Sequence, residues 1–87
     1  MSLEKLTHSE KIDRLKKTLL SLIPHNSNGQ LPYILRRQAD ARLDYRVKWG
    51  YMQEAFDELY EEGKVYPEQD FKHSITKRAS LSLLYQN

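Results

Sequence analysis

The spacing of apolar residues changes at Gly63, and this change favours a fold that joins a helix to strands. Before this glycine, apolar residues recur at intervals of four, three, four and three: Tyr45, Trp49, Met52, Phe56 and Leu59. Such spacing places these side chains on one face of a helix. After Gly63, the segment 64–67 is short and ends in a proline, which is typical of a strand. Gly63 itself lies where a left-handed residue would end the helix.

The start of this helix is less well defined by the sequence. Asp44 is a suitable N-cap residue. Gly50 would then lie inside the helix, at a cost of about 1 kcal/mol relative to alanine. Either the helix begins near Lys48, or another group approaches the backbone closely at Gly50. Trp49 and Phe56 are expected in the core in both cases.

A first helix is predicted over residues 8–23. Thr7 and Glu10 fit a capping box, in which each side chain bonds the other residue's amide. The apolar residues that follow share one helical face: Ile12, Leu15, Leu19, Leu22 and Ile23. Pro24 ends the helix, and residues 25–29 form a loop rich in turn-forming residues.

A second helix is predicted over residues 32–42. Gln30 and Leu31 form a short extended piece, because Pro32 biases the residue before it to an extended conformation. Pro32 is also acceptable in the first turn of a helix. One apolar stripe follows: Leu31, Leu35, Ala39 and Leu43, joined by Ile34. Three residues are expected to face away from it: Arg36, Arg37 and Asp40.

The C-terminal part alternates with a period of two. Residues 68–74 read as a polar loop. From Ile75 onward the odd positions are apolar except Lys77, and most even positions are polar. This pattern predicts a half-buried strand. Leu81, Leu84 and Tyr85 also fit a helical turn, so a terminal helix is the alternative.

Length and composition indicate one domain over residues 8–87, preceded by a tail of residues 1–7. The 87 residues include no cysteine, which excludes disulfides, thiol nucleophiles and cysteine-ligated zinc. No apolar run is long enough to span a membrane, and the first residues lack the apolar stretch of a signal peptide. A soluble, cytoplasmic protein is therefore expected.

The segment from Met52 to Val65 resembles the third helix and first wing strand of winged-helix domains. The matching positions are Met52, Phe56, Leu59, Gly63 and Val65. The resemblance implies a small α+β domain in which three helices are followed by a β-hairpin wing. A plain helical bundle with an irregular tail is the alternative fold.

The resemblance also implies duplex DNA as the ligand, read by the start of the third helix and by the wing. The groove-facing candidates are Arg46, Lys48, Gly50 and Tyr51. The wing candidates are Lys72, His73, Lys77 and Arg78. Arg36, Arg37 and Arg42 would contact the neighbouring backbone. The protein would then be a small transcriptional or replication regulator.

Each basic group has a simpler interpretation beside the functional one. The second-helix arginines fit a solvated face, and the wing cations fit a hairpin edge protected from aggregation. Arg46 and Lys48 oppose the helix dipole, which prefers anions at a helix start. That cost favours a ligand role for both.

The remaining tyrosines are expected at the boundary of the core: Tyr33, Tyr60 and Tyr66.

The charge distribution counts partly against DNA. Residues 1–52 carry a net charge of +5, residues 53–70 carry −6, and residues 71–87 carry +3. The exposed face of the third helix is therefore acidic and would repel phosphates. The isoelectric point of about 8.9 is slightly below that of a basic nucleic-acid-binding domain.

The second hypothesis is a protein-interaction or dimerisation module. The acidic third helix would face a basic partner, or the last segment would pair with its copy. The apolar end available for a homodimer comprises Leu81, Leu83, Leu84 and Tyr85. A dimer would also suit a two-fold DNA site.

Catalysis is not expected from this sequence. The histidines His8, His25 and His73 are scattered, and none has a second ligand at metal-binding spacing. No glycine-rich phosphate loop is present, and no nucleophile lies beside a base. We therefore expect no catalytic residue, metal, cofactor or small-molecule substrate.

Overall fold

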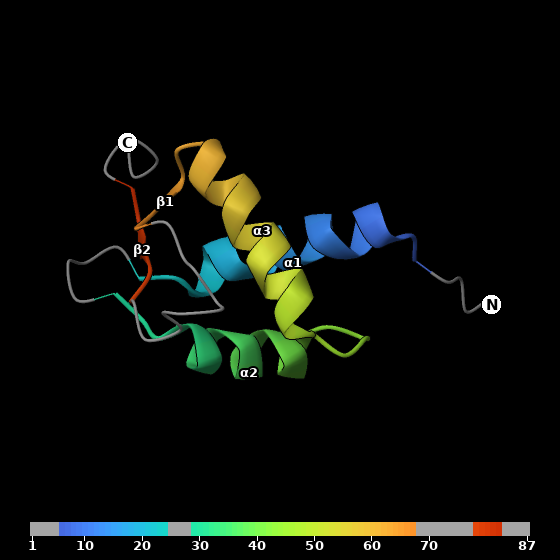
Figure 1. The fold of residues 1–87 in the computed structure, drawn as a ribbon. Coiled ribbons are helices and arrows are strands. Elements are labelled where there is room, and N and C mark those ends of the chain that lie inside the picture. Colours follow the sequence, from blue (N-terminus) through green and yellow to red (C-terminus); the bar gives the residue numbers. More distant parts are fainter. Residues whose placement is uncertain (1–5, 25–28, 68–77, 83–87) are drawn as a thin grey trace.

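The computed structural model describes residues 6–24, 29–67 and 78–82. The elements follow in the order α1 (His8–Leu22), α2 (Pro32–Arg42), α3 (Trp49–Glu61), β1 (Val65–Tyr66) and β2 (Ser80–Leu81). Three helices are thus followed by a two-stranded antiparallel sheet (Figure 1). This confirms the expected α+β class and the element order of a winged helix, and it excludes a purely helical bundle.

Helix α1 begins with the expected capping box. The Thr7 hydroxyl accepts from the Glu10 amide at 3.1 Å, and the Thr7 amide donates to the Glu10 carboxylate at 2.9 Å. The hydrogen bond from the Thr7 amide is the main cause that lowers the pKa of the Glu10 carboxyl. Ile23 caps the other end by donating its amide to the Leu19 carbonyl. The helix therefore ends one residue before the expected boundary.

Helix α2 has the expected bounds, and Pro32 occupies its first turn. Leu35 and Ala39 are fully buried, so they form the inner stripe. Ile34 is only half-buried and lies on the outer side beside Arg37 and Gln38. It therefore does not belong to the inner stripe as expected.

Helix α3 begins at Trp49, and its N-cap residue is Lys48, whose side chain makes no capping bond. The expected Asp44 cap is wrong, because residues 43–48 form a separate turn. Gly50 consequently lies in the first turn, and a Cβ built on it would meet nothing within 4 Å. Of the two explanations for Gly50, the later helix start is confirmed.

Trp49 is not a core residue, which corrects the expectation from its spacing. Its side chain is 37% exposed, whereas Phe56 on the same helix is 1% exposed. As the first residue of α3, Trp49 lies at the end of the helix, and a helical side chain leans toward the N-terminus. Its ring therefore covers the preceding turn and not the core.

The expected glycine cap ends α3. Gly63 has a φ of 75°, which is in the left-handed region. Its amide bonds the Tyr60 carbonyl at 3.0 Å, and the Lys64 amide bonds the Leu59 carbonyl at 2.9 Å. These are the two bonds of a Schellman motif, which turns the chain into β1.

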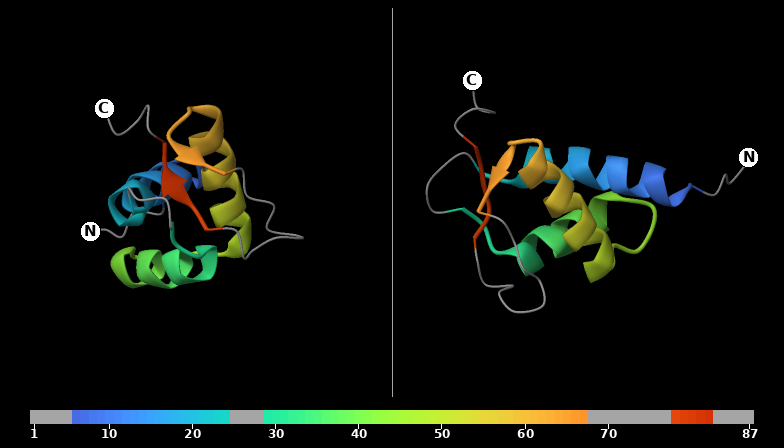
Figure 2. Two further views of the ribbon diagram at one scale, coloured as in Figure 1. Left: turned by 90° about the vertical axis from the view of Figure 1, so that its left-hand side faces the viewer. Right: turned by 45° about the horizontal axis from the view of Figure 1, so that its top comes forward.

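The small sheet lies at one end of the helices (Figure 2). Val65 pairs with Leu81, and Tyr66 pairs with Ser80. Gln30 adds an isolated antiparallel bridge to Ala79, which confirms the expected extended piece before α2. Ser80 is 3% exposed, so the strand does not alternate as expected. The other expected strand residues, 75–77 and 83–85, and the loop 68–74 lie outside the described residues.

The core lies where α1 packs against α2 and α3, with the sheet closing one end. Its buried residues come from every element and from the α2–α3 turn: Ile12, Leu15, Leu19, Ile23, Leu35, Ala39, Val47, Met52, Ala55, Phe56, Leu59, Val65, Ala79 and Leu81. Tyr33, Tyr60 and Tyr66 are between 43% and 46% exposed, which agrees with the expected boundary positions.

Candidate nucleic-acid interface

The turn between α2 and α3 is held by a clamp of two α2 side chains on Val47. The Val47 amide donates to Asp40 Oδ1 at 2.8 Å. Arg36 Nη1 donates to the Val47 carbonyl at 3.2 Å. Val47 is itself fully buried. Arg36 and Asp40 are four residues apart and therefore lie on the same side of α2, so together they fix the chain just before α3.

Arg36 also supports the ring of Trp49. Its guanidinium carbon lies 5.6 Å from the ring centroid, which is a cation–π contact. The Arg36 Nε atom is buried and has no hydrogen-bond partner among the described residues. Arg36 was expected to face the solvent, but it is half-buried and links α2 to the start of α3.

An open hollow lies at this junction. It has a volume of about 400 Å³ and is lined by Arg36, Arg46, Val47, Lys48 and Trp49. A second hollow of about 480 Å³ shares Arg36 and Arg46 with the first. The second hollow also contains Asp40 and Asp44, whereas the first is lined by three cations and no acid.

The first turn of α3 favours an anion at this place. It contains no acidic residue, and no side chain caps it. The first amides of a helix have no partner within the helix, and the dipole makes that end positive. Arg46 and Lys48 are both exposed beside it. Backbone and side chains therefore produce a positive potential at the same hollow.

The structure brings together only part of the expected DNA-binding set. Arg36, Arg46 and Lys48 meet at the hollow. Arg37 lies on the outer side of α2, in a different hollow. Arg42 donates to the Ser21 hydroxyl at 3.3 Å and thus links α2 to α1. Arg78 is exposed just before β2. Lys72, His73 and Lys77 lie outside the described residues.

Tyr51 lies against α1 and not at the hollow. Its ring centroid is 5.5 Å from that of His8 and 6.3 Å from that of Tyr45. Lys11 on α1 places its ammonium group 5.8 Å from the Tyr51 centroid. The ring is half-buried and packs on the core. Its contacts are therefore those of a residue that joins α1 to α3.

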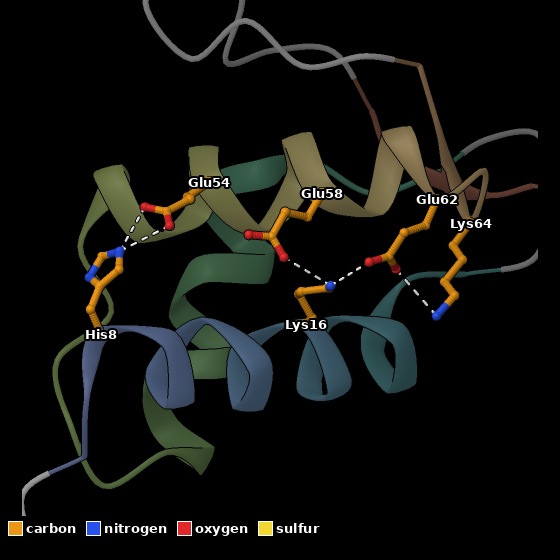
Figure 3. A network of polar contacts seen from close by, with 6 residues as sticks. All are labelled: His8, Lys16, Glu54, Glu58, Glu62 and Lys64. Carbon is orange, nitrogen blue, oxygen red and sulfur yellow. Dashed lines mark hydrogen bonds and ion pairs between the residues drawn. The ribbon is translucent and has the colours of Figure 1, made fainter.

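Three acidic side chains of α3 and its C-cap contact basic side chains of α1 and Lys64 (Figure 3). Glu54 is 2.8 Å from His8, and Glu58 is 3.0 Å from Lys16. Glu62 is 2.6 Å from Lys16 and 3.3 Å from Lys64. The acidic face of α3 is thus directed largely at α1, which the sequence did not indicate.

These contacts change two acid–base equilibria. The hydrogen bond from Lys16 is the main cause that lowers the pKa of Glu62. Burial alone would lower the pKa of Lys16, but its hydrogen bonds to Glu62 and Glu58 outweigh burial and raise that pKa. Both shifts favour the charged pair between α1 and α3.

The apolar C-terminal end expected at a homodimer interface is described only in part. Leu81 is 1% exposed and packs within the core, so it is not available to a second copy. Leu83, Leu84 and Tyr85 lie outside the described residues. The homodimer stays a prediction, to be checked by measuring mass against concentration.

Within residues 6–24, 29–67 and 78–82, no group of three or more histidine or acidic side chains could hold a metal ion. None of the helices described is long and apolar enough to cross a membrane. Comparison with protein-family models, curated proteins and solved structures found no match.

Sequence reasoning missed the clamp on Val47 and the exposure of Trp49. The signal for the clamp was present, because Arg36 and Asp40 are four residues apart and precede an isolated apolar residue. Trp49 gave no such signal, because its spacing from Met52 and Phe56 is that of a core residue.

Proposed function

We propose that this protein is a non-enzymatic, winged-helix-type domain that binds duplex DNA through the start of α3, as a small transcriptional or replication regulator. The observation that carries the proposal is the hollow where Arg36, Arg46 and Lys48 surround the uncapped, acid-free first turn of α3. Phosphate neutralisation by such cations supplies much of the affinity of DNA-binding proteins.

The direction in which the acidic side chains point also supports the start of α3 as the DNA-binding surface. Glu58 and Glu62 pair with Lys16 of α1, Glu62 also with Lys64, and Glu54 hydrogen-bonds the His8 ring. Glu54 points to His8 on α1, and Asp57, the next acid of α3, lies eight residues, or about 12 Å along the axis, beyond Trp49. A duplex that meets only the first turns of α3 therefore approaches cations first.

The element order supports a winged-helix geometry. Gln30 bridges to Ala79 beside the pair of β1 and β2, so the extended piece before α2 joins the sheet. In winged-helix domains the start of the third helix enters the major groove. The proposed role places the protein in the compartment that holds DNA, which in a bacterium is the cytoplasm.

The test is a salt titration of the full chain on a labelled duplex of random sequence, read by fluorescence anisotropy. Affinity should fall steeply between low and physiological salt, because phosphate contacts release counterions. Arg46→Ala and Lys48→Ala should each weaken binding several-fold. Each should also reduce the slope of log affinity against log salt concentration by about one, because one phosphate contact is lost.

Lys17→Ala is the matched control for both variants. Lys17 is an exposed cation on α1, so its removal changes the net charge equally. If Lys17→Ala weakens binding as much as Lys48→Ala does, the attraction is general and the start of α3 is not the interface. A wild-type protein that fails to bind duplex DNA at low salt would overturn the proposal and favour a protein-interaction module.

A further inference from the structure

We propose that Trp49 reads the 5-methyl groups of thymine in the major groove and so makes the domain prefer thymine-containing sites. This inference rests on the proposed function, because it assigns a sequence-reading role to one residue of the same surface. The observation behind it is an apolar ring, 37% exposed, at the first residue of α3 among cations.

The ring is held in place before any ligand arrives. Arg36 lies over it at 5.6 Å, and the same Arg36 is bound to the Val47 carbonyl. The turn that carries the ring is fixed a second time by Asp40. A side chain held in this way loses little conformational entropy on binding, so its apolar contacts contribute more of their energy to affinity.

The surface beside the ring is open to a large partner. Gly50, the next residue of α3, has no side chain, and a Cβ built on it would meet nothing within 4 Å, so the helix surface beside Trp49 is open at this point among the described residues. Arg46 and Lys48 are the immediate neighbours on the other side. These cations and the ring line one hollow, so a duplex whose phosphates bind Arg46 and Lys48 would bring its base edges close to the ring.

The chemistry of the base edges selects thymine. In the major groove the other bases present only hydrogen-bond donors and acceptors, whereas thymine presents a methyl group. Arg36 already lies over the ring, and the remaining exposed carbon surface of the indole packs well on a methyl group. The major-groove edge that fits an exposed, rigid tryptophan is therefore that of thymine.

The experiment compares an alternating d(A-T) duplex with the d(A-U) duplex that lacks only the methyl groups. The alternating sequence offers a methyl group in every register, so the unknown target sequence does not matter. The full-length wild type should bind the thymine duplex about fourfold more tightly for each methyl group that the ring covers. Trp49→Ala should reduce this ratio to about one.

Tyr60→Ala is the matched control, because Tyr60 is another exposed aromatic residue of α3, at 44% exposure. It should keep the wild-type ratio. A second arm needs no variant: 5-methylcytosine in an alternating d(G-C) duplex should increase wild-type affinity, because it adds a methyl group at the same major-groove position.

The outcomes separate this inference from the proposed function. Tight binding with equal affinity for thymine and uracil duplexes would overturn the inference and leave DNA binding intact. A wild type that binds neither duplex would overturn both. Tighter binding to single-stranded d(T) and d(U) oligonucleotides than to either duplex would assign the ring to base stacking and overturn methyl reading.

Discussion

A side chain added at Gly29 would collide with neighbouring atoms, whereas one added at Gly50 would not. Alanine substitutions at these two glycines therefore form a matched test at the scale of single residues. Gly29 has a φ of 64°, and a Cβ there would lie 2.8 Å from the Ala79 carbonyl oxygen and 2.9 Å from Arg78 Cβ. Gly29→Ala should therefore destabilise the protein by about 1 kcal/mol or more, through strain and loss of the adjacent bridge.

Gly50→Ala serves as the counterpart. Its site is open, and it lies in a helical first turn. Alanine should be neutral there or stabilise the helix by up to about 1 kcal/mol. Urea unfolding followed by circular dichroism measures both variants. Equal destabilisation by the two substitutions would contradict the packing around Gly29.

The clamp on Val47 leads to a second prediction at the residue scale. Asp40→Ala leaves the buried Val47 amide without its acceptor, and an unsatisfied buried donor costs about 1–3 kcal/mol. Asp44→Ala should change stability by less than about 0.5 kcal/mol, because Asp44 is exposed and does not cap α3. Thermal unfolding distinguishes them. A larger loss from Asp44→Ala would restore Asp44 as the helix cap.

Local chemistry explains which single residues could be predicted from the sequence. The Thr7–Glu10 box and the Gly63 cap depend on neighbours within four residues, and both are confirmed. The exposure of Trp49 depends on the path of residues 43–48, which is set by Asp40 and Arg36 on another element. A spacing rule contains no information about that path.

At the scale of elements, the junction of α1 and α3 should respond to acid. Lys16 lowers the pKa of Glu62. The stability that their contact contributes is therefore fully present at a pH above the ordinary pKa of a glutamate, and it is lost as the pH falls through the lowered pKa. Between pH 7 and pH 3 the loss from this contact should be about 1 kcal/mol or less, because both partners are near the surface.

Lys16→Met removes this contact and should flatten the change in stability between pH 7 and pH 3. Lys17→Met is the control, since Lys17 is exposed on the next position of α1 and should leave the wild-type pH profile unchanged. Denaturant midpoints at several pH values provide the measurement. Identical profiles for wild type and Lys16→Met would show that the pair contributes nothing.

The element boundaries show where sequence patterns succeed. Helix α2 agrees with its expected bounds, and α1 differs by one residue, because proline and capping residues mark their ends. The predicted start of α3 at Asp44 is too early. Aspartate often caps helices, but this chain places Asp44 in the turn before α3. The facing of Glu54 and Glu58 toward α1 could not be predicted, since it depends on how two helices cross.

At the scale of the whole molecule, stability depends on a small core shared by every element. Phe56 is the largest of its fully buried side chains. Phe56→Ala should cost about 3–5 kcal/mol, which is a large share of the roughly 5–10 kcal/mol expected for a domain of this size. Tyr60→Ala on the exposed side should cost less than about 1 kcal/mol.

Urea unfolding followed by far-ultraviolet circular dichroism tests this difference. A Phe56→Ala protein with a wild-type midpoint would contradict the shared core.

The charge pattern behaves differently at this scale. The sum of +2 suggested little about partners, whereas the fold directs Glu58 and Glu62 toward Lys16 and leaves Arg46 and Lys48 exposed at the start of α3.

The position of Trp49 gives the protein a built-in optical reporter. It is the single tryptophan of the chain, and it lies at the candidate interface and not in the core. Its emission should therefore change little on unfolding, because the ring is already partly hydrated. Occupation of the hollow should quench or shift the emission strongly. Binding and unfolding can thus be followed independently on the same unlabelled protein, by tryptophan emission and by circular dichroism.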